Sequence, residues 1–437
     1  MVWIVPAELE AVVHAATRAA LGDSPLATAA LTKAIIDRSR RYTSERDRPA
    51  TDRTGDLAAR AMFFTIADAM KIAIPLGELH NRGALPAARP LRIVDLGCGC
   101  GAMSLGAILA LSEISAPGPR GIPTALGAAP HAPQAPHAQA AQAPDASQAP
   151  ASQAPHAPQA PDAPQAPDAS FAPARETGGA LRLEITAIDR DTGALAIARD
   201  AIRQLAAGRG LDVTVATRDE DVTRTRIPPA DLVVIGTLLN ELVPTARVEL
   251  VQRALAAIGD DGAVIIIEPA LRDTARALHE LRDAIVAAGR GHVFAPCTRT
   301  RLPCPALADP SDWCHEDRAL QLPRRTAELA RLTHLRDGGM KFAYLVLRRA
   351  PVTLVENPAA WRMVSAPMPA KGKLEIIGCS AAGRMPIRLL RRHRAPDNRG
   401  VEAADRGDVL VVDAAPDEAR LEITGETRVE RIEPAKR

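Results

Sequence analysis

The spacing of apolar residues changes along the chain and predicts where its elements lie. Between Ala7 and Leu76, apolar side chains recur every three or four positions, which is typical of one buried face of a helix. From Leu91 onward, short continuous apolar runs alternate with stretches of helical periodicity. Continuous runs are typical of parallel strands covered on both faces. The pattern predicts an N-terminal helical domain at 1–88 and a doubly wound α/β sheet at 89–290.

One insertion interrupts this sheet, and two further segments follow it. Residues 116–175 are Ala-Pro-Gln repeats with too little apolar surface for a core, so we predict a disordered surface insertion. Residues 291–349 hold a cysteine-rich loop and a last sheet strand at 342–347, and we predict a small basic β region at 350–437. With 437 residues, 47% of them hydrophobic, the chain is long and apolar enough for real cores.

A glycine-rich turn follows the first predicted strand. Asp95 ends the apolar run, and Gly97, Gly99 and Gly101 alternate with other residues before a helix begins. Glycines allow the backbone to approach a ligand closely, and the free N–H groups of the next helix face an anion. The D-x-G-x-G-x-G spacing differs from the dinucleotide fingerprint. It resembles the first motif of class I methyltransferases, in which the turn holds the methionine end and the ribose of S-adenosylmethionine (SAM).

Acidic residues at the ends of the next two strands are candidates for binding the rest of a nucleotide. Asp189 lies 28 positions beyond Gly101 once residues 116–175 are set aside, close to the spacing of a ribose-binding acid. After the third strand, Asp219 and Asp221 are both candidates for contact with the adenine amine. The sequence therefore predicts a cofactor site made of the glycine turn and these acids.

The end of the fourth strand is where many methyltransferases keep their catalytic group. Thr237, Asn240 and Glu241 follow that strand here and are polar enough to line a pocket. They form neither the Asn/Asp-Pro-Pro-aromatic signature of amine methylation nor the cysteine nucleophile of pyrimidine carbon-5 methylation. The sequence therefore supports cofactor binding better than catalysis.

Cysteines gather downstream of the sheet. Cys297, Cys304 and Cys314 lie within eighteen positions in a proline-rich stretch, and Cys379 follows later. This pattern suggests a metal held by irregular backbone, with Cys379 or His315 as the fourth ligand. Zinc is the default for such a set, although the spacings are wider than in common zinc ribbons, and Cys-Pro is a weak indication of iron–sulfur ligation.

Basic residues cluster on both sides of the last cysteines, although the net charge of the whole chain is only +2. Two such runs favour a partner with a phosphate backbone, such as RNA. Because aromatic residues make up only 2% of the chain, we expect the protein to recognise the phosphates and the shape of the RNA and not to stack on its bases. The runs comprise Arg318, Arg324, Arg325, Arg331, Arg336, Lys341, Arg348 and Arg349, then Arg384, Arg388, Arg391, Arg392, His393, Arg394 and Arg399.

The first residues and the apolar runs bear on location. Met1 to Glu10 lacks a basic leader, so neither a secretion signal nor a transit peptide is expected. No apolar run reaches membrane-spanning length. We therefore expect a cytosolic, cytoplasmic protein without a membrane partner.

Taken in order, these segments resemble the bacterial and mitochondrial family of methyltransferase-like small-ribosomal-subunit proteins. The resemblance covers most of the chain outside the insertion, and the ordered set is more specific than any single member. The matching stretches are Asp95 to Gly101, Leu239-Asn240-Glu241-Leu242, Cys297, Cys304-Pro305, Trp313-Cys314-His315, Tyr344 to Arg349, and Gly378-Cys379 with Gly383. The long insertion, and Glu316 where the family tends to an aromatic residue, depart from it.

The resemblance implies a fold, cofactors and partners. It implies a SAM-methyltransferase Rossmann-like fold, a 4Fe–4S cluster on Cys297, Cys304, Cys314 and Cys379, and docking on small-subunit ribosomal RNA during assembly. We expect a monomer away from the ribosome and a cofactor domain that binds without turnover. The alternative is an active SAM-dependent rRNA methyltransferase with a structural zinc site, in which Thr237, Asn240 or Glu241 lies near the transferred methyl group.

Overall fold

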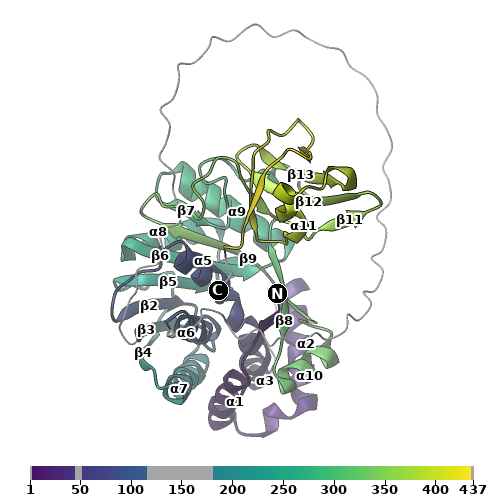
Figure 1. The fold of residues 1–437 in the computed structure, drawn as a ribbon. Helices are drawn as coiled ribbons and strands as arrows, with labels where there is room; N and C mark the ends of the chain where they lie inside the picture. The colour runs from purple at the N-terminus through teal and green to yellow at the C-terminus, as the bar shows by residue number, and fades with distance from the viewer. Residues whose placement is uncertain (1, 45–51, 116–180, 337, 435–437) are drawn as a thin grey trace. The chain divides into compact units, whose positions relative to one another are not determined.

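The computed structural model describes residues 2–44, 52–115, 181–336 and 338–434 (Figure 1). The insertion predicted at 116–175 lies outside the described residues.

A sheet of nine strands organises most of the described chain, in the order β1-β8-β9-β6-β5-β2-β3-β4, with β7 beside β9. The strands β4, β3, β2, β5 and β6 are mutually parallel, and β9 closes the row antiparallel to β6. This confirms the predicted doubly wound, Rossmann-like α/β sheet. The bounds are β1 (Trp3–Ile4), β2 (Leu91–Leu96), β3 (Arg182–Asp189), β4 (Asp212–Asp219), β5 (Ala230–Gly236), β6 (Ile258–Pro269), β7 (His292–Ala295), β8 (Glu316–Gln321) and β9 (Gly339–Arg348).

Helices cover both faces of this sheet. On one face, α8 (Pro244–Ala257) and α9 (Arg272–Ala287) pack their apolar sides against β5, β6 and β9. On the other face, α6 (Ala102–Ser115) and α7 (Thr192–Gly208) share one core with the N-terminal helices and with α10 (Arg324–Thr333). The central strands β2, β5, β6 and β9 are buried on both faces because they carry continuous apolar runs, whereas no residue of the edge strand β4 is fully buried.

The N-terminal periodicity forms helices, as predicted. Between Arg53 and Asn81 the helical path changes type several times, and the segment η2 (Arg60–Thr65) is a turn of π-helix, a local widening that is frequent at functional sites. The other members are α1 (Ala7–Leu21), η1 (Ser24–Leu26), α2 (Thr28–Ser44), α3 (Arg53–Ala59), α4 (Ile66–Asp68), η3 (Ala69–Ile72) and α5 (Ala73–Asn81).

A second sheet of seven strands follows and has its own core, around Trp361, Ile376 and Leu410. Its order is β15-β13-β12-β10-β14-β16, with β11 beside β12, which confirms a β-rich C-terminal region. The bounds are β10 (Ala360–Met363), β11 (Met368–Ala370), β12 (Lys373–Ser380), β13 (Gly383–Leu390), β14 (Val409–Val412), β15 (Leu421–Ile423) and β16 (Val429–Ile432). The short helices η6 (Arg391–His393), η7 (Pro396–Asn398) and α11 (Arg399–Ala403) follow β13.

A buried polar network joins the N-terminal helices and both sheets. The guanidinium of Arg362 on β10 donates to Glu78 Oε1 at 2.8 Å, Glu316 Oε1 at 2.9 Å and the Tyr344 hydroxyl oxygen at 2.9 Å. The hydroxyl of Tyr344 lies 2.8 and 2.7 Å from the two carboxylate oxygens of Glu78. Arg362, Glu78 and Glu316 are 3, 0 and 6% exposed, and Arg318, 2.9 Å from Glu316 Oε2, supplies the second positive charge beside the two carboxylates.

Candidate functional site

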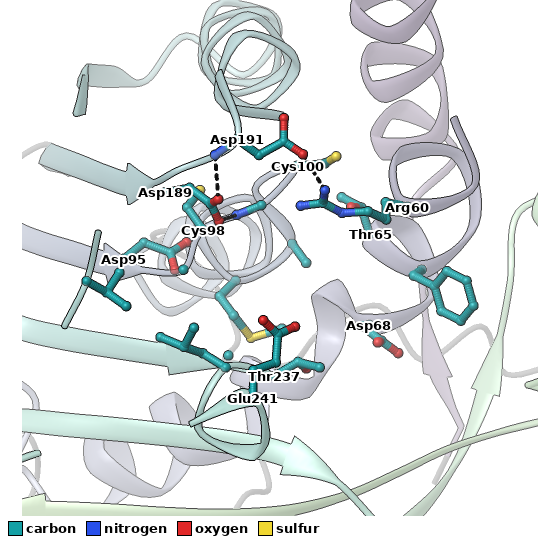
Figure 2. Close-up of a pocket in the computed structure, with 18 of the residues that line it drawn as sticks. Arg60, Thr65, Asp68, Asp95, Cys98, Cys100, Asp189, Asp191, Thr237 and Glu241 are labelled. Carbon is teal, nitrogen blue, oxygen red and sulfur yellow. Dashed lines mark hydrogen bonds and ion pairs between the residues drawn. The ribbon is translucent and has the colours of Figure 1, made fainter. Parts of the chain in front are cut away.

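A cavity of about 560 Å³ lies at the carboxyl ends of β2, β3 and β5 (Figure 2). Its lining comes from the glycine turn, from the ends of β3 and β5, and from the N-terminal helices α2 and η2. In doubly wound sheets, ligands bind at this edge. The volume is in the range of a site for a nucleotide-sized molecule.

The glycine turn forms part of the cavity wall. Gly99 has a φ of +54° and lines the cavity, so its backbone is open to a ligand. Gly101 has a φ of +89° and does not line the cavity; a Cβ there would lie 3.1 Å from that of Ala198 on α7. The predicted glycines therefore divide their roles, with Gly97 and Gly99 facing the cavity and Gly101 allowing close helix packing.

Asp95 and Asp189 hold the turn in place. Asp95 is buried, and its carboxylate accepts from Ser104 Oγ at 2.6 Å and from the Ser104 backbone N–H at 3.2 Å. Burial raises the pKa of Asp95 to about 6. Asp189 accepts from the Gly99 backbone N–H at 2.8 Å and from the Asp191 backbone N–H at 2.9 Å. Both aspartates line the cavity.

The acids after β4 are arranged differently from one another. Asp219 pairs in register with Asp189 on β3 but is not among the residues that line the cavity. Asp221 lines the cavity together with Glu220, and its carboxylate accepts from the backbone N–H and the hydroxyl of Thr223, both at 2.8 Å. Of the two residues predicted to contact the adenine amine, Asp221 is therefore the one that lines the cavity.

The segment after β5 is bent sharply into the site. Thr237 lines the cavity and has a φ of +57°, which is unusual for a β-branched residue. Glu241 also lines the cavity. Asn240 does not, because its amide donates to Glu268 Oε2 at 2.7 Å. The three catalytic candidates are thus separated, with two facing the cavity and one turned toward Glu268.

Glu268, at the end of β6, anchors this bent segment. Its Oε1 accepts from the backbone N–H groups of Leu238 at 3.0 Å and Leu239 at 2.8 Å, in addition to the bond from Asn240. Burial raises its pKa to about 7. Sequence reasoning gave Glu268 no role, although its place at a strand end beside a proline was a signal.

Several cavity residues come from the N-terminal helices, which the sequence did not connect to the site. Arg60 and Asp191 form an ion pair of 2.5 Å across the mouth of the glycine turn (Figure 2). Phe64 has the guanidinium groups of Arg38 and Arg336 at 5.9 and 6.0 Å from its ring centre. No local pattern could have found these residues, because their role depends on tertiary packing.

A second, smaller cavity brings together the four cysteines that the sequence singled out. Cys297, Cys304 and Cys314 approach it from the segments around β7 and before β8, and Cys379 reaches it from β12. All four thiols are free. Burial, together with the neighbouring Cys297 and Cys304 sulfurs, raises the pKa of Cys379 to about 12. His315 lines the same cavity.

Buried cationic and N–H groups surround this cysteine cavity. Arg282, Arg362 and Arg384 line it. In the part of the chain that the structure describes, Nε of Arg282, Nε of Arg362 and Nδ1 of His315 are buried and have no hydrogen-bond partner. The backbone is fixed by Asp283, which accepts from the Cys304 N–H at 2.9 Å, and by His279, whose Nε2 accepts from the Cys314 N–H at 3.2 Å.

No three His, Cys, Asp or Glu side chains among the described residues are grouped so that they could hold one metal ion. The four thiols therefore share a cavity without the close tetrahedral grouping of a structural zinc site, in which sulfur lies about 2.3 Å from the ion.

Several residues of the basic runs are paired with acids or buried. Lys341 pairs with Asp317, Arg348 is buried against the Ala84 carbonyl, and Arg388 pairs with Glu422. A group of exposed basic residues lies in the turn between β11 and β12 and in the segment after β13, and these two parts are joined where the Arg391 N–H donates to the Gly372 carbonyl at 2.9 Å. We call it the basic edge; within the described residues its members have no acidic partner, and they are Lys371, Arg391, Arg392 and Arg399.

Comparison with solved structures finds methyltransferases at low similarity. Magnesium protoporphyrin IX methyltransferase from Synechocystis PCC 6803 with bound SAM is 9% identical, with a TM-score of 0.31, and the match covers 72% of this chain and 97% of that one. TrmN from Thermus thermophilus is 15% identical, with a TM-score of 0.26, and covers 65% and 53%. No curated protein matches the sequence.

No helix within the described ranges is long and apolar enough to span a membrane. One family model does match, over residues 167–410. This range includes the cavity-lining residues Asp189 and Asp221, the four cysteines of the second cavity and the basic edge. The match covers more than half of the chain, and the protein therefore belongs to the family described as mitochondrial small ribosomal subunit Rsm22.

Proposed function

We propose that this protein is a SAM-binding, methyltransferase-like factor that carries an iron–sulfur cluster and docks on small-subunit ribosomal RNA during assembly. The observation that carries the proposal is the glycine turn and Asp189 facing one cavity at the carboxyl edge of a doubly wound sheet. Family membership supplies the link to the small ribosomal subunit.

The cavity residues fit SAM. The cavity-lining backbone at Gly97 and Gly99 would lie against the methionine end, Asp189 would bind the ribose hydroxyls and Asp221 the adenine amine. When bound, SAM supplies an electrophilic methyl group. Isothermal titration of the purified protein with SAM tests this assignment: we expect micromolar binding that Gly99→Arg abolishes, and unchanged binding in that variant would contradict it.

We propose binding without turnover. Thr237 and Glu241 reach the cavity, whereas Asn240 is held by Glu268 and does not line it. Incubation with methyl-labelled SAM and immature small subunits decides the matter. We expect no sustained transfer of label; transfer that is lost in Gly99→Arg would instead establish the active rRNA methyltransferase.

We propose that the cysteine cavity holds a 4Fe–4S cluster, as the resemblance to the family implies, with a zinc ion as the alternative. Four thiols line it, the arginines there would offset the charge of thiolates, and the unpartnered Nε–H groups of Arg282 and Arg362 would gain sulfur acceptors.

An anaerobic visible absorption spectrum tests the cluster. We expect a brown protein with a broad charge-transfer absorption band in the blue part of the visible spectrum. The Cys379→Ser variant should lose this band. The Cys98→Ser variant, changed in the glycine turn, should retain it. A colourless protein that holds stoichiometric zinc would overturn the assignment.

The basic edge is the proposed contact with ribosomal RNA. Its arginines are exposed and unpaired, and neutralising phosphates releases counterions, so affinity should fall steeply with salt. Arg391→Glu with Arg392→Glu should weaken binding to small-subunit RNA at least tenfold and flatten the salt dependence. Arg203→Glu on α7, an exposed charge change away from this edge, is the control; equal losses in both variants would contradict the proposal. We further propose a monomer away from the ribosome, which sedimentation tests.

A further inference from the structure

Arg60 reaches the glycine turn from the N-terminal helices. It is the first residue of the π-helical turn η2, and its side chain is 21% exposed and lines the SAM-sized cavity. Its Nη2 lies 3.2 Å from the position that a Cβ on Gly99 would occupy. The guanidinium thus lies directly over the part of the turn where a ligand can come closest (Figure 2).

One edge of this guanidinium is used and the other is open. Nη1 donates to Asp191 Oδ2 at 2.5 Å, and Asp191 is the only hydrogen-bond acceptor of the Arg60 side chain among the described residues. Asp191 is itself fixed as the N-cap of α7, where it accepts from the Ala194 N–H at 3.0 Å. Asp191 therefore positions Arg60 and leaves Nη2 facing the cavity.

A planar guanidinium with an open edge beside a helix N-terminus suits a carboxylate, since both supply N–H donors and positive potential. The helix α6 begins at Ala102, directly after the turn. We infer that Arg60 binds the α-carboxylate of the methionine part of SAM, so that the N-terminal helices complete the cofactor site. This inference rests on the proposed binding of SAM.

The test compares two ligands that differ in this carboxylate, by titration calorimetry on the full-length protein. S-adenosylhomocysteine carries the amino-acid end, whereas 5′-methylthioadenosine lacks it. We expect Arg60→Gln to weaken binding of S-adenosylhomocysteine about 10- to 100-fold. Binding of 5′-methylthioadenosine should change less than about twofold, because that ligand does not reach Arg60.

Arg41→Gln is the matched control. Arg41 pairs with Asp56 at 2.5 Å and does not line the cavity, so neither affinity should change. Arg60→Lys should retain part of the preference for the carboxylate. If Arg60→Gln weakens both ligands equally, or neither, the inference is wrong while the proposed SAM site stands. If neither ligand binds the unmodified protein, both fall.

A ligand-side measurement avoids any change to the protein. The methyl ester of S-adenosylhomocysteine has no carboxylate charge, and we expect the unmodified protein to bind it at least tenfold more weakly than the free acid. Equal affinities for the ester and the acid would overturn the inference even if every Arg60 variant failed to fold.

Discussion

Thr237 combines a branched side chain with left-handed backbone at the wall of the cofactor cavity. Its φ of +57° costs an L-residue with a branched Cβ about 1 to 2 kcal/mol, and its N–H is held by the Ile267 carbonyl at 2.8 Å. The turn after β5 is therefore kept in a costly conformation by its neighbours.

Thr237→Asn should relieve this strain, because Asn tolerates the left-handed region. We expect the free energy of unfolding in urea to rise by about 1 kcal/mol. Thr217→Asn, in the extended strand β4, should give no gain. Loss of stability in Thr237→Asn would show that contacts of the threonine side chain outweigh the strain.

Glu268 gives the protein a pH-dependent stability. Burial raises its folded-state pKa from 4.5 to about 7, so the folded state holds a proton that the unfolded state has released. The contribution of Glu268 to the free energy of unfolding should therefore be largest below pH 4.5 and should fall as the pH rises to about 7. At about 1.4 kcal/mol per pKa unit, the change is on the order of 3 kcal/mol.

The variant Glu268→Gln removes this titration while retaining an acceptor for the Leu238 and Leu239 N–H groups. We expect its stability relative to the unmodified protein to increase between pH 5 and pH 8, measured by urea unfolding at each pH. Glu184→Gln, at an exposed position of β3, should show no such trend. A constant difference across this range would contradict the assigned pKa.

Two helical glycines should respond oppositely to the same change. A Cβ on Gly106 of α6 would lie 1.9 Å from the Ala69 carbonyl oxygen, whereas a Cβ on Gly208 of α7 would meet nothing within 4 Å. Gly106→Ala should therefore lower the free energy of unfolding by about 3 kcal/mol, because the contact is with backbone that cannot move aside. Gly208→Ala should raise it by about 0.5 kcal/mol. Thermal unfolding followed by circular dichroism measures both.

Arg362 joins the parts of the molecule through two buried carboxylates. Removing it leaves Glu78 without its cationic partner and leaves Glu316 paired with Arg318 alone, so Arg362→Met should cost about 3 to 5 kcal/mol of unfolding free energy. Arg182→Met breaks the exposed pair with Asp212 and should cost less than about 1 kcal/mol. Similar losses in the two variants, by urea unfolding, would mean that the buried network contributes little.

The basic runs show how a linear pattern can overstate a surface. The two basic runs of the sequence suggest one positive surface, but the folded chain pairs several of their members with acids or buries them. Arg336 binds Asp68 beside the cavity, and Arg384 pairs with Asp312 near the cysteines. Arg324 and Arg331 on α10, together with the basic edge, stay exposed and have no acidic partner among the described residues, as expected of a phosphate-binding surface.

Local chemistry was enough to predict the parallel strands, the glycine turn and the N-terminal helices, because apolar periodicity and glycine spacing are properties of neighbouring residues. The same reasoning singled out Asp95, Asp189 and the four cysteines, which the folded chain places at two cavities. The sequence could not show whether Asp219 or Asp221 faces the cavity, because the two residues are only two positions apart and follow the same strand.

Contacts between distant segments could come only from the folded structure. Arg60 faces Asp191 across 131 positions, Cys379 meets Cys297 through a second sheet, and Asn240 is turned away from the cavity by Glu268. Each of these depends on how whole elements pack, and side-chain packing carries no signature in the residues on either side. The periodicity of apolar residues therefore determines the fold class, whereas tertiary contacts determine which residues line each cavity.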